Sequence, residues 1–508
     1  MRASSNGRGV ALAAALVAAL TLVPVVVVVG DALSAEGAGA AAEFLLRPRV
    51  GMLLGNTGLL VAVTVPATVV LGTVAAWLVE RTALPGAGVW RTLLLAPLAV
   101  PAFVSAYAWV SVAPSMTGFG GAALVTTLAY FPFVFLPVAA MLRALDPGDE
   151  EAARSLGLSR GAALRRTVLP RLRPALSGGA LLVALHVLAE YGVLEMMRFQ
   201  TFTTAVMQQY AVGFGGVTGS LLATVLLLLC VLVLTAEVVA RGRHRVARVG
   251  SGAQGHATPV GLGGWTVPAV AFLGLVVAGA VGVPVVTLVR WLVAGRGVTG
   301  PLADDLAGVV VSTVALALLG ALVTGLAALP AAWLLNRRRT SAALLLERTT
   351  FLASALPGVV VGLALVTLSV RWARPAYQTV GLLAAAYVIL FLPRAMVALR
   401  AGLAAAPPEM SEAAASLGLR GPARLARVVL PLAAPSVLAG FVLVALAIST
   451  ELTATLLLAP TGTDTLALAF WRAASELDYA TAAPYAAAMV ALSAPLTLLL
   501  RRQILVAR

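Results

Sequence analysis

Apolar residues along this chain fall into blocks of about 20, separated by short segments rich in Arg, Gly and Pro. A helix of roughly 20 residues crosses the hydrocarbon core of a bilayer, which is about 30 Å thick. The blocks do not alternate apolar with polar residues, as membrane-spanning strands do. The pattern therefore predicts an all-α integral membrane protein with about twelve transmembrane helices. The predicted spans lie near residues 10–30, 52–79, 89–112, 120–142, 174–194, 217–239, 265–291, 307–335, 349–370, 378–399, 434–457 and 480–500.

The first predicted span has two interpretations. Arg2 and Arg8 precede it and "ALSA" follows it, which is also the layout of a cleaved signal peptide. Its apolar run of about 20 residues is longer than the usual signal-peptide core of roughly 7 to 15. We favour a retained helix, and the cleaved peptide stays the alternative.

The two halves of the chain repeat one another at offsets of 256 to 262 residues. Each repeat holds six predicted spans, and because six is even, both repeats enter the membrane from the same side. The recurring pairs are Trp77 with Trp333, Pro137 with Pro393, Glu190 with Glu451, and "TFTTA" from Thr201 with "TDTLA" from Thr463. The repeat predicts a first half over residues 1–240 and a second over 265–508, joined by a flexible basic, Gly-rich linker over 241–264.

A polar insert occurs once in each half, over residues 146–171 and 407–432. The first insert contains "EEAARSLGLSRGAALRRTVLP" and the second "SEAAASLGLRGPARLARVVLP". Asp146, Pro147 and the acids after them are typical of a helix start, and Gly157 of a helix end. Each insert is thus predicted to form a helix, a Gly turn, and a second helix that ends at the Leu-Pro pair. Pro408 takes the place of Pro147 in the second copy.

Composition and charge support the membrane assignment and give an orientation. The chain is 61% apolar and 11% charged, with a mean hydropathy of +1.00, too little polar material for a soluble protein of 508 residues. All 35 basic residues are Arg, and 27 of them lie in one set of alternate loops against 8 in the other. The positive-inside rule then predicts that both termini and the linker are cytoplasmic. The net charge of +15 is read as topology, and no nucleic-acid partner is expected, because no basic run is interleaved with aromatics.

Several classes of site are excluded by the residues present. The single cysteine, Cys230, cannot form a disulfide framework or a Cys-based metal cluster. No span carries the His-Asp, His-Glu or Ser-His sets of an enzyme, so no catalytic residues are predicted. The motif G-x-x-x-x-G-K-[ST] is missing from the sequence, so no cofactor is expected on this chain and any ATP and Mg would be bound by other subunits.

The inserts use about 30 residues where a connection needs only a few, which indicates a docking site for a cytoplasmic partner. "EAARSLG…LP" and "EAAASLG…LP" resemble the EAA loop of ABC-importer permeases, which seats a coupling helix in a cytoplasmic ATPase. The resemblance implies a type I importer fold in the cell inner membrane, two ATPase copies and an extracytoplasmic solute-binding protein. It implies ATPase coupling by Glu151, Ala152, Ala153, Gly157, Pro170, Glu412, Ala413, Ala414, Gly418 and Pro431.

The segments "AEYGVLEMMRFQTFTTAVMQQY" and "ELTATLLLAPTGTDTLALAFWRAASELDYATAAPYA" are similar to those of fused ferric-iron permeases. Glu190, Tyr191 and Glu451 then become candidate residues of the translocation pathway, with transient metal contact at the two acids and no stable metal site. Oxygen ligands suit a hard cation such as ferric ion. Local neutralisation of each acid, by His186 in the first half, is the competing interpretation. Thiamine permeases and, more distantly, ion-coupled secondary transporters remain alternatives.

Overall fold

A computed structural model describes most of the chain, and every structural statement below refers to the described part. The described residues are 5–34, 39, 43–145, 148–211, 216–241, 259–295, 302–337, 349–350, 355–406 and 408–506. Over these residues the regular structure is helical, and its β pairing consists of one isolated parallel bridge, between Thr82 and Val260. Most of the predicted linker, the helix start at Asp146 and Pro147, and the C-terminal Arg508 lie outside this part.

The described helices account for most of the predicted spans. Nine of them are long and apolar enough to cross a membrane, and a bent pair makes a tenth if it counts as one span. α18, at the predicted ninth span, is apolar but shorter, with 15 residues. α25, at the predicted twelfth, contains Pro484 and Pro495 and is not among the nine. The all-α membrane architecture is confirmed, while the count of twelve stays a prediction.

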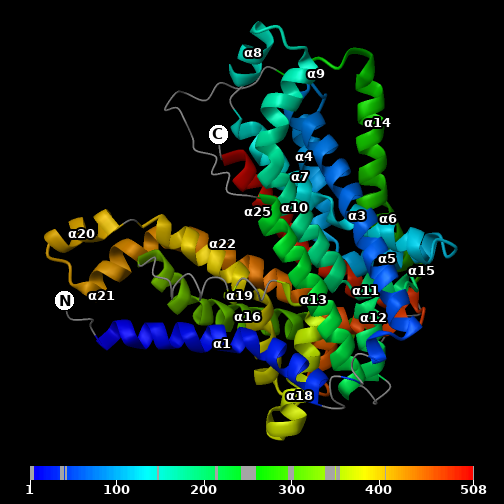
Figure 1. The fold of residues 1–508 in the computed structure, drawn as a ribbon, viewed down its shortest axis with the longest axis vertical. Helices are drawn as coiled ribbons and strands as arrows, with labels where there is room; N and C mark the ends of the chain where they lie inside the picture. Colours follow the sequence, from blue (N-terminus) through cyan, green and yellow to red (C-terminus); the bar gives the residue numbers. More distant parts are fainter. Residues whose placement is uncertain are drawn as a thin grey trace. The chain divides into compact units, whose positions relative to one another are not determined.

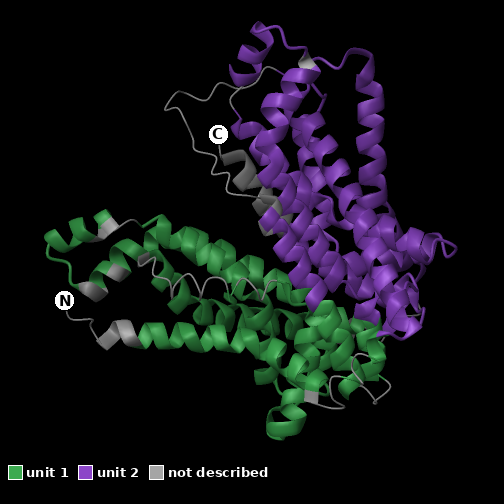
Figure 2. Ribbon diagram, viewed as in Figure 1, with its two compact units in different colours: residues 1–45, 205–227, 300–472 green, residues 46–204, 228–299, 473–508 purple. Residues whose placement is uncertain are grey.

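Contacts divide the chain into two compact units, which Figure 2 colours separately. Unit 1 comprises Met1–Leu45, Ala205–Leu227 and Gly300–Arg472, and unit 2 comprises Leu46–Thr204, Leu228–Thr299 and Ala473–Arg508. α12 (Phe202–Ala211), α13 (Gly216–Arg241) and α24 (Leu466–Ser475) run across the boundaries between them. Each unit is described by itself.

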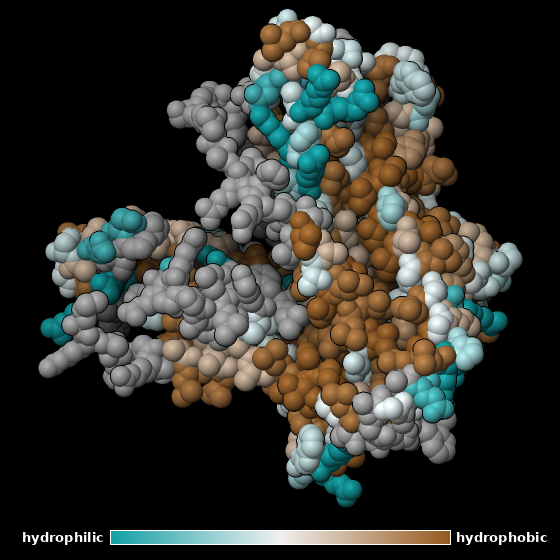
Figure 3. Space-filling view, in the orientation of Figure 1, coloured by the Kyte–Doolittle hydropathy of each residue, from teal (hydrophilic) through white to brown (hydrophobic). Residues whose placement is uncertain are grey.

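Unit 2 is built on three helices, α3, α7 and α10, which pack against one another side by side (Figure 1). Its described elements are α3 (Pro48–Arg81), α4 (Ala87–Leu95), η1 (Ala96–Ala99), α5 (Ala102–Val112), α6 (Phe119–Tyr130), α7 (Pro132–Ala144), α8 (Gly148–Ser155), α9 (Arg160–Ala163), η2 (Leu164–Val168), α10 (Leu169–Ala189), α11 (Gly192–Met196), η3 (Gly263–Trp265), α14 (Thr266–Val277), η4 (Ala278–Gly282), α15 (Val283–Ala294) and α25 (Tyr479–Val506). On the face shown in Figure 3, hydrophilic side chains gather around α8 and α9, and hydrophobic ones cover the longer helices.

Unit 1 repeats this plan with α16, α19 and α22 as its three central helices. Its described elements are α1 (Ser5–Ser34), α16 (Leu302–Arg337), α18 (Gly358–Trp372), η6 (Arg374–Ala376), α19 (Val380–Ala404), α20 (Pro408–Ser416), α21 (Gly421–Arg424), η7 (Leu425–Val429), α22 (Leu430–Ser449) and α23 (Thr453–Leu458). Small residues bring these helices close together: a Cβ added to Gly440 of α22 would lie 2.1 Å from the Cβ of Ala398 on α19. Close approach of this kind is how apolar helices gain packing energy in lipid.

The two compact units do not coincide with the two sequence halves, because each unit contains helices from both halves. α1, from the first half, packs on α16 and α18 of the second, and α15, from the second half, packs on α5 of the first. A buried polar contact fixes α1: Asp31 lies 2.5 Å from the guanidinium of Arg371 on α18 and accepts a hydrogen bond of 2.7 Å from Ser220 on α13. The predicted halves describe the repeat, whereas the packing exchanges their first helices.

Three predicted spans are broken instead of continuous. The predicted span 89–112 is the bent pair α4–η1 and α5, whose axes differ by 93°. Pro101 lies at the bend, in the position just before the first residue of α5. Because proline has no backbone N–H, it cannot donate the hydrogen bond that would continue the preceding helix. The predicted spans 174–194 and 434–457 stop at Ala189 and Ser449, and a short helix follows each of them.

Candidate functional site

The first insert forms the predicted helix and Gly turn. α8 carries Glu151 on its exposed side, while Ala153 is buried. At the end of α8 the Gly157 N–H donates to the Arg154 carbonyl at 3.0 Å, and the Leu158 N–H donates to the Ala153 carbonyl at 3.2 Å. With a φ of 90° at Gly157, this is a Schellman turn, which satisfies the last helical carbonyls. The turn leaves the Leu156 side chain 86% exposed.

The second insert repeats that geometry bond for bond. α20 begins at Pro408, as predicted, and Gly418 has a φ of 84°. The Gly418 N–H donates to the Ala415 carbonyl at 3.0 Å, and the Leu419 N–H donates to the Ala414 carbonyl at 3.1 Å. Glu412 and Ala413 are exposed on α20, Ala414 is buried, and Leu417 is 83% exposed. Each insert thus presents a leucine to solvent beside a turn of the same shape.

The prediction that Leu-Pro ends the second helix of each insert is wrong. The chain passes from α9 through η2 into α10 without a break, with Pro170 in the first turn of α10, and Pro431 has the same place in α22. η2 and η7 are π-helical segments directly ahead of these prolines. A π turn shifts the hydrogen-bond pattern by one residue, which accommodates the N–H that proline lacks. Each insert is therefore continuous with a membrane-spanning helix.

Only the first insert is tied to that helix by an ion pair among the described residues. Asp149 of α8 pairs with Arg171 in the first turn of α10. The corresponding positions in the second half are Met410 and Leu432, which are apolar. The inserts therefore share their turn geometry and differ in how they are fastened.

The two predicted pathway acids lie at helix breaks. Glu190 follows the last residue of α10, and its Oε1 accepts the Val193 N–H of α11 at 3.1 Å. Glu451 lies just after α22, and its carboxylate accepts the backbone N–H groups of Ala454 and Thr455 of α23, both at 2.9 Å. Both carboxylates cap the helix that comes next. Backbone N–H groups therefore partner both acids, whereas the competing interpretation named His186 for the first half.

A tyrosine completes each break, and the sequence analysis missed it. The Tyr130 hydroxyl donates to Oε2 of Glu190. In the second half the Tyr387 hydroxyl lies 2.9 Å from the Oγ1 of Thr455. The Thr455 hydroxyl in turn donates to the Glu451 carboxylate at 2.7 Å. Tyr130 and Tyr387 recur at an offset of 257, so the repeat itself carried the signal.

The remaining predicted contacts are only partly brought together. His186 lies one turn before Glu190, but its Nδ1 is 2.7 Å from the Leu182 carbonyl and its ring packs against Tyr130 and Phe133. Tyr191 is buried at the start of α11. The described residues contain no cluster of three or more His, Cys, Asp or Glu side chains able to hold a metal ion.

Comparison with known proteins places this geometry in a family. Residues 68–241 and 324–504 each match the family described as the binding-protein-dependent transport system inner membrane component. The chain belongs to this family. The matched segments confirm the internal repeat and the resemblance to ABC-importer permeases, and this permease is a multi-pass membrane protein.

Individual relatives of the permease differ in how much of it they cover. It is 36% identical over 464 residues to the Fe(3+)-transport system permease protein FbpB 2 of Haemophilus influenzae, which covers 91% of each chain. Sulfate permease 2 of Chlamydomonas reinhardtii chloroplasts is 30% identical over 40% of this chain and 60% of its own. The sulfate transport system permease protein CysT of Salmonella typhimurium is 32% identical over 24% of this chain and 50% of its own.

Proposed function

We propose that this permease is the membrane-spanning subunit of an ATP-driven importer of ferric iron, which an extracytoplasmic binding protein delivers. One observation carries the substrate: the relative named for Fe(3+) transport aligns over 91% of both chains, whereas the sulfate permeases align over less than half of this one. The alignment with this relative extends across both halves of the chain, and so across both inserts.

The two inserts are the proposed sockets for two copies of a cytoplasmic ATPase. Their support is the shared Schellman turn and the exposed leucines Leu156 and Leu417, which give each insert an apolar contact beside a fixed turn. Because α9 leads through η2 into α10 without a break, a displacement of the insert by the ATPase would move the membrane-spanning helix α10 directly. In this proposal ATP and Mg are bound on the partner subunits, which hydrolyse the ATP, and this chain is a transport subunit without a cofactor.

The helix breaks favour a cation over an oxyanion as the substrate. A free helix N-terminus attracts anions, and sulfate binds well there. In this permease Glu190 and Glu451 already occupy the N-termini of α11 and α23. An arriving anion would meet a carboxylate, whereas a hard cation finds carboxylate and phenol oxygens. This arrangement supports the proposal that ferric ion makes transient contact with Glu190 and Glu451.

The orientation rests on the distribution of Arg. We place the permease in the cell inner membrane, with its termini and the linker 241–264 in the cytoplasm. Both inserts then face the cytoplasmic ATPase. The contact surface then lies on the side where ATP is available.

The proposal is tested by uptake into vesicles that contain the permease, its cognate ATPase and its binding protein. Radiolabelled ferric iron, sulfate and thiamine are offered in parallel, with ATP present or absent and with the proton gradient dissipated. We expect accumulation of ferric iron that requires ATP and persists without the gradient. ATP-dependent uptake of sulfate or thiamine in place of iron would refute the substrate, and uptake driven by the gradient alone would refute the ABC mechanism.

A further inference from the structure

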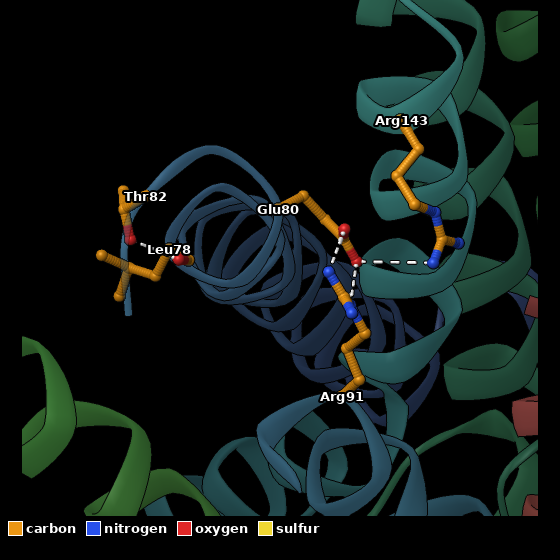
Figure 4. Close-up of polar contacts among 5 residues, drawn as sticks. All are labelled: Leu78, Glu80, Thr82, Arg91 and Arg143. Carbon is orange, nitrogen blue, oxygen red and sulfur yellow. Dashed lines mark hydrogen bonds and ion pairs between the residues drawn. The ribbon is translucent and has the colours of Figure 1, made fainter. Parts of the chain in front are cut away.

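A buried carboxylate joins three helices at the end of unit 2 that carries the first insert (Figure 4). Glu80 lies in the last turn of α3, with its side chain 2% exposed. It accepts two hydrogen bonds of 2.9 Å from Arg91 of α4, one from Nε and one from Nη2. A second guanidinium, that of Arg143 on α7, lies 3.6 Å from the same carboxylate. A bidentate pair of this kind fixes both distance and orientation.

The carboxylate is linked to the first insert through Arg143 of α7. Arg143 is in the last turn of α7, and α8 begins at Gly148. Arg81, the neighbour of Glu80, is buried, with 5% of its surface exposed. The backbone of α3 at this end also pairs with Val260, which donates to the Arg81 carbonyl at 2.9 Å. The end of α3 therefore meets α4, α7 and the segment around Val260, and α7 leads directly into the insert.

The second half lacks this carboxylate. The offset of 256 that pairs Trp77 with Trp333 places Asn336 opposite Glu80. Arg143 corresponds to Arg400 at an offset of 257, so an arginine recurs while the acid does not. The Asn336 amide is neutral and does not replace the charge of the Glu80 carboxylate. The Glu80 carboxylate and the Asp149–Arg171 pair of the first half therefore have no ionisable counterparts at the matching positions Asn336, Met410 and Leu432.

We propose that Glu80 is a positioning residue of the first ATPase socket, which holds the ends of α3, α4 and α7 as one rigid body so that movement of α8 is transmitted to the spans. The inference rests on the proposed function, and it deepens it by making the two sockets unequal. Buried ion pairs contribute little net stability because desolvation offsets their attraction. A fixed geometry, rather than stability, is therefore what this pair supplies.

The test compares Glu80→Gln with Asn336→Gln, which changes the equivalent position of the second half. In the vesicle assay we expect Glu80→Gln to keep its ATPases but to transport about five-fold less iron per ATP hydrolysed, the scale of a typical coupling free energy. Asn336→Gln should transport as the wild type does. Normal uptake per ATP in Glu80→Gln, or an equal loss in Asn336→Gln, would overturn the proposal.

Two further measurements separate positioning from folding and from the proposed function. The double variant Glu80→Gln with Arg91→Gln has one unpaired guanidinium fewer than Glu80→Gln, so the yield of folded protein should recover. Its iron transport per ATP hydrolysed should stay low, and a normal value would overturn the proposal. Spin labels on cysteines introduced at the exposed positions Val89 and Leu156 report the distance from α4 to the insert without any transport. The chain's own single cysteine, Cys230, is buried. A broader distance distribution in Glu80→Gln is expected even if the wild-type complex failed to take up iron, which would refute only the proposed function. An unchanged distribution would overturn the brace.

Discussion

Replacing Gly157 and Gly418 by Val should damage both sockets through the backbone alone. The φ values of these residues are 90° and 84°, a region that β-branched residues strongly avoid. A Cβ added to either glycine would meet no atom within 4 Å, so the substitution causes no steric overlap with a neighbour. Whatever the variants lose therefore measures the cost of the turn conformation itself.

The size of that cost follows from the turn geometry. A residue held in a sparsely populated backbone region costs about 1–3 kcal/mol. At about 2 kcal/mol per turn, the ratio of formed to unformed turns falls roughly 30-fold. The hydrogen bonds of 3.0 to 3.2 Å that close each turn cannot be kept without this strain. Insertion of the spans should be unaffected, because it depends on hydropathy and flanking Arg.

The assay is purification of the complex from membranes, with the ATPase-to-permease ratio, ATP hydrolysis and iron uptake measured on one preparation. Gly157→Asn with Gly418→Asn is the matched control, since Asn adopts the left-handed region far more readily than Val. We expect the double Val variant to lose ATPase subunits or coupling and the double Asn variant to keep most of both. A double Val variant that binds its ATPases and transports normally would refute the reasoning, and so would equal damage by Asn and Val.

Two further outcomes are expected. Reporter fusions at Arg508 and within the linker 241–264 should both report the cytoplasm, because 27 of 35 arginines lie in the loops on that side; an exterior signal at either point would contradict the topology. Glu190→Gln together with Glu451→Gln should lower iron uptake by about ten-fold or more, the effect of losing a charged partner worth ~1.5–3 kcal/mol. Membrane levels and ATPase binding should be unchanged, because the Gln oxygen still accepts one capping N–H group at each site. Unchanged uptake would leave both acids as helix caps.

The sequence by itself determined the features that depend on local chain chemistry. Blocks of apolar residues predicted the helical membrane architecture, since a span is set by the length of chain that lipid can solvate. The repeat was visible because both copies must solve the same packing problem, and comparison confirmed it. The turns at Gly157 and Gly418 were predictable because glycine enters the left-handed region at little cost.

The tertiary structure alone decided where helices break and which helices meet. Hydropathy cannot distinguish a helix that faces lipid from one that faces protein, so it could not show that α1 packs on the second half or that α15 packs on the first. The breaks at Glu190 and Glu451 sit inside apolar runs, and they persist because the carboxylates satisfy the N–H groups that the breaks expose. Nothing in the sequence singled out Glu80, which follows the predicted span 52–79; the packing of α4 and α7 places two guanidinium groups beside its carboxylate. Contacts of this kind join residues distant in sequence, and only the packed chain brings them within reach of one another.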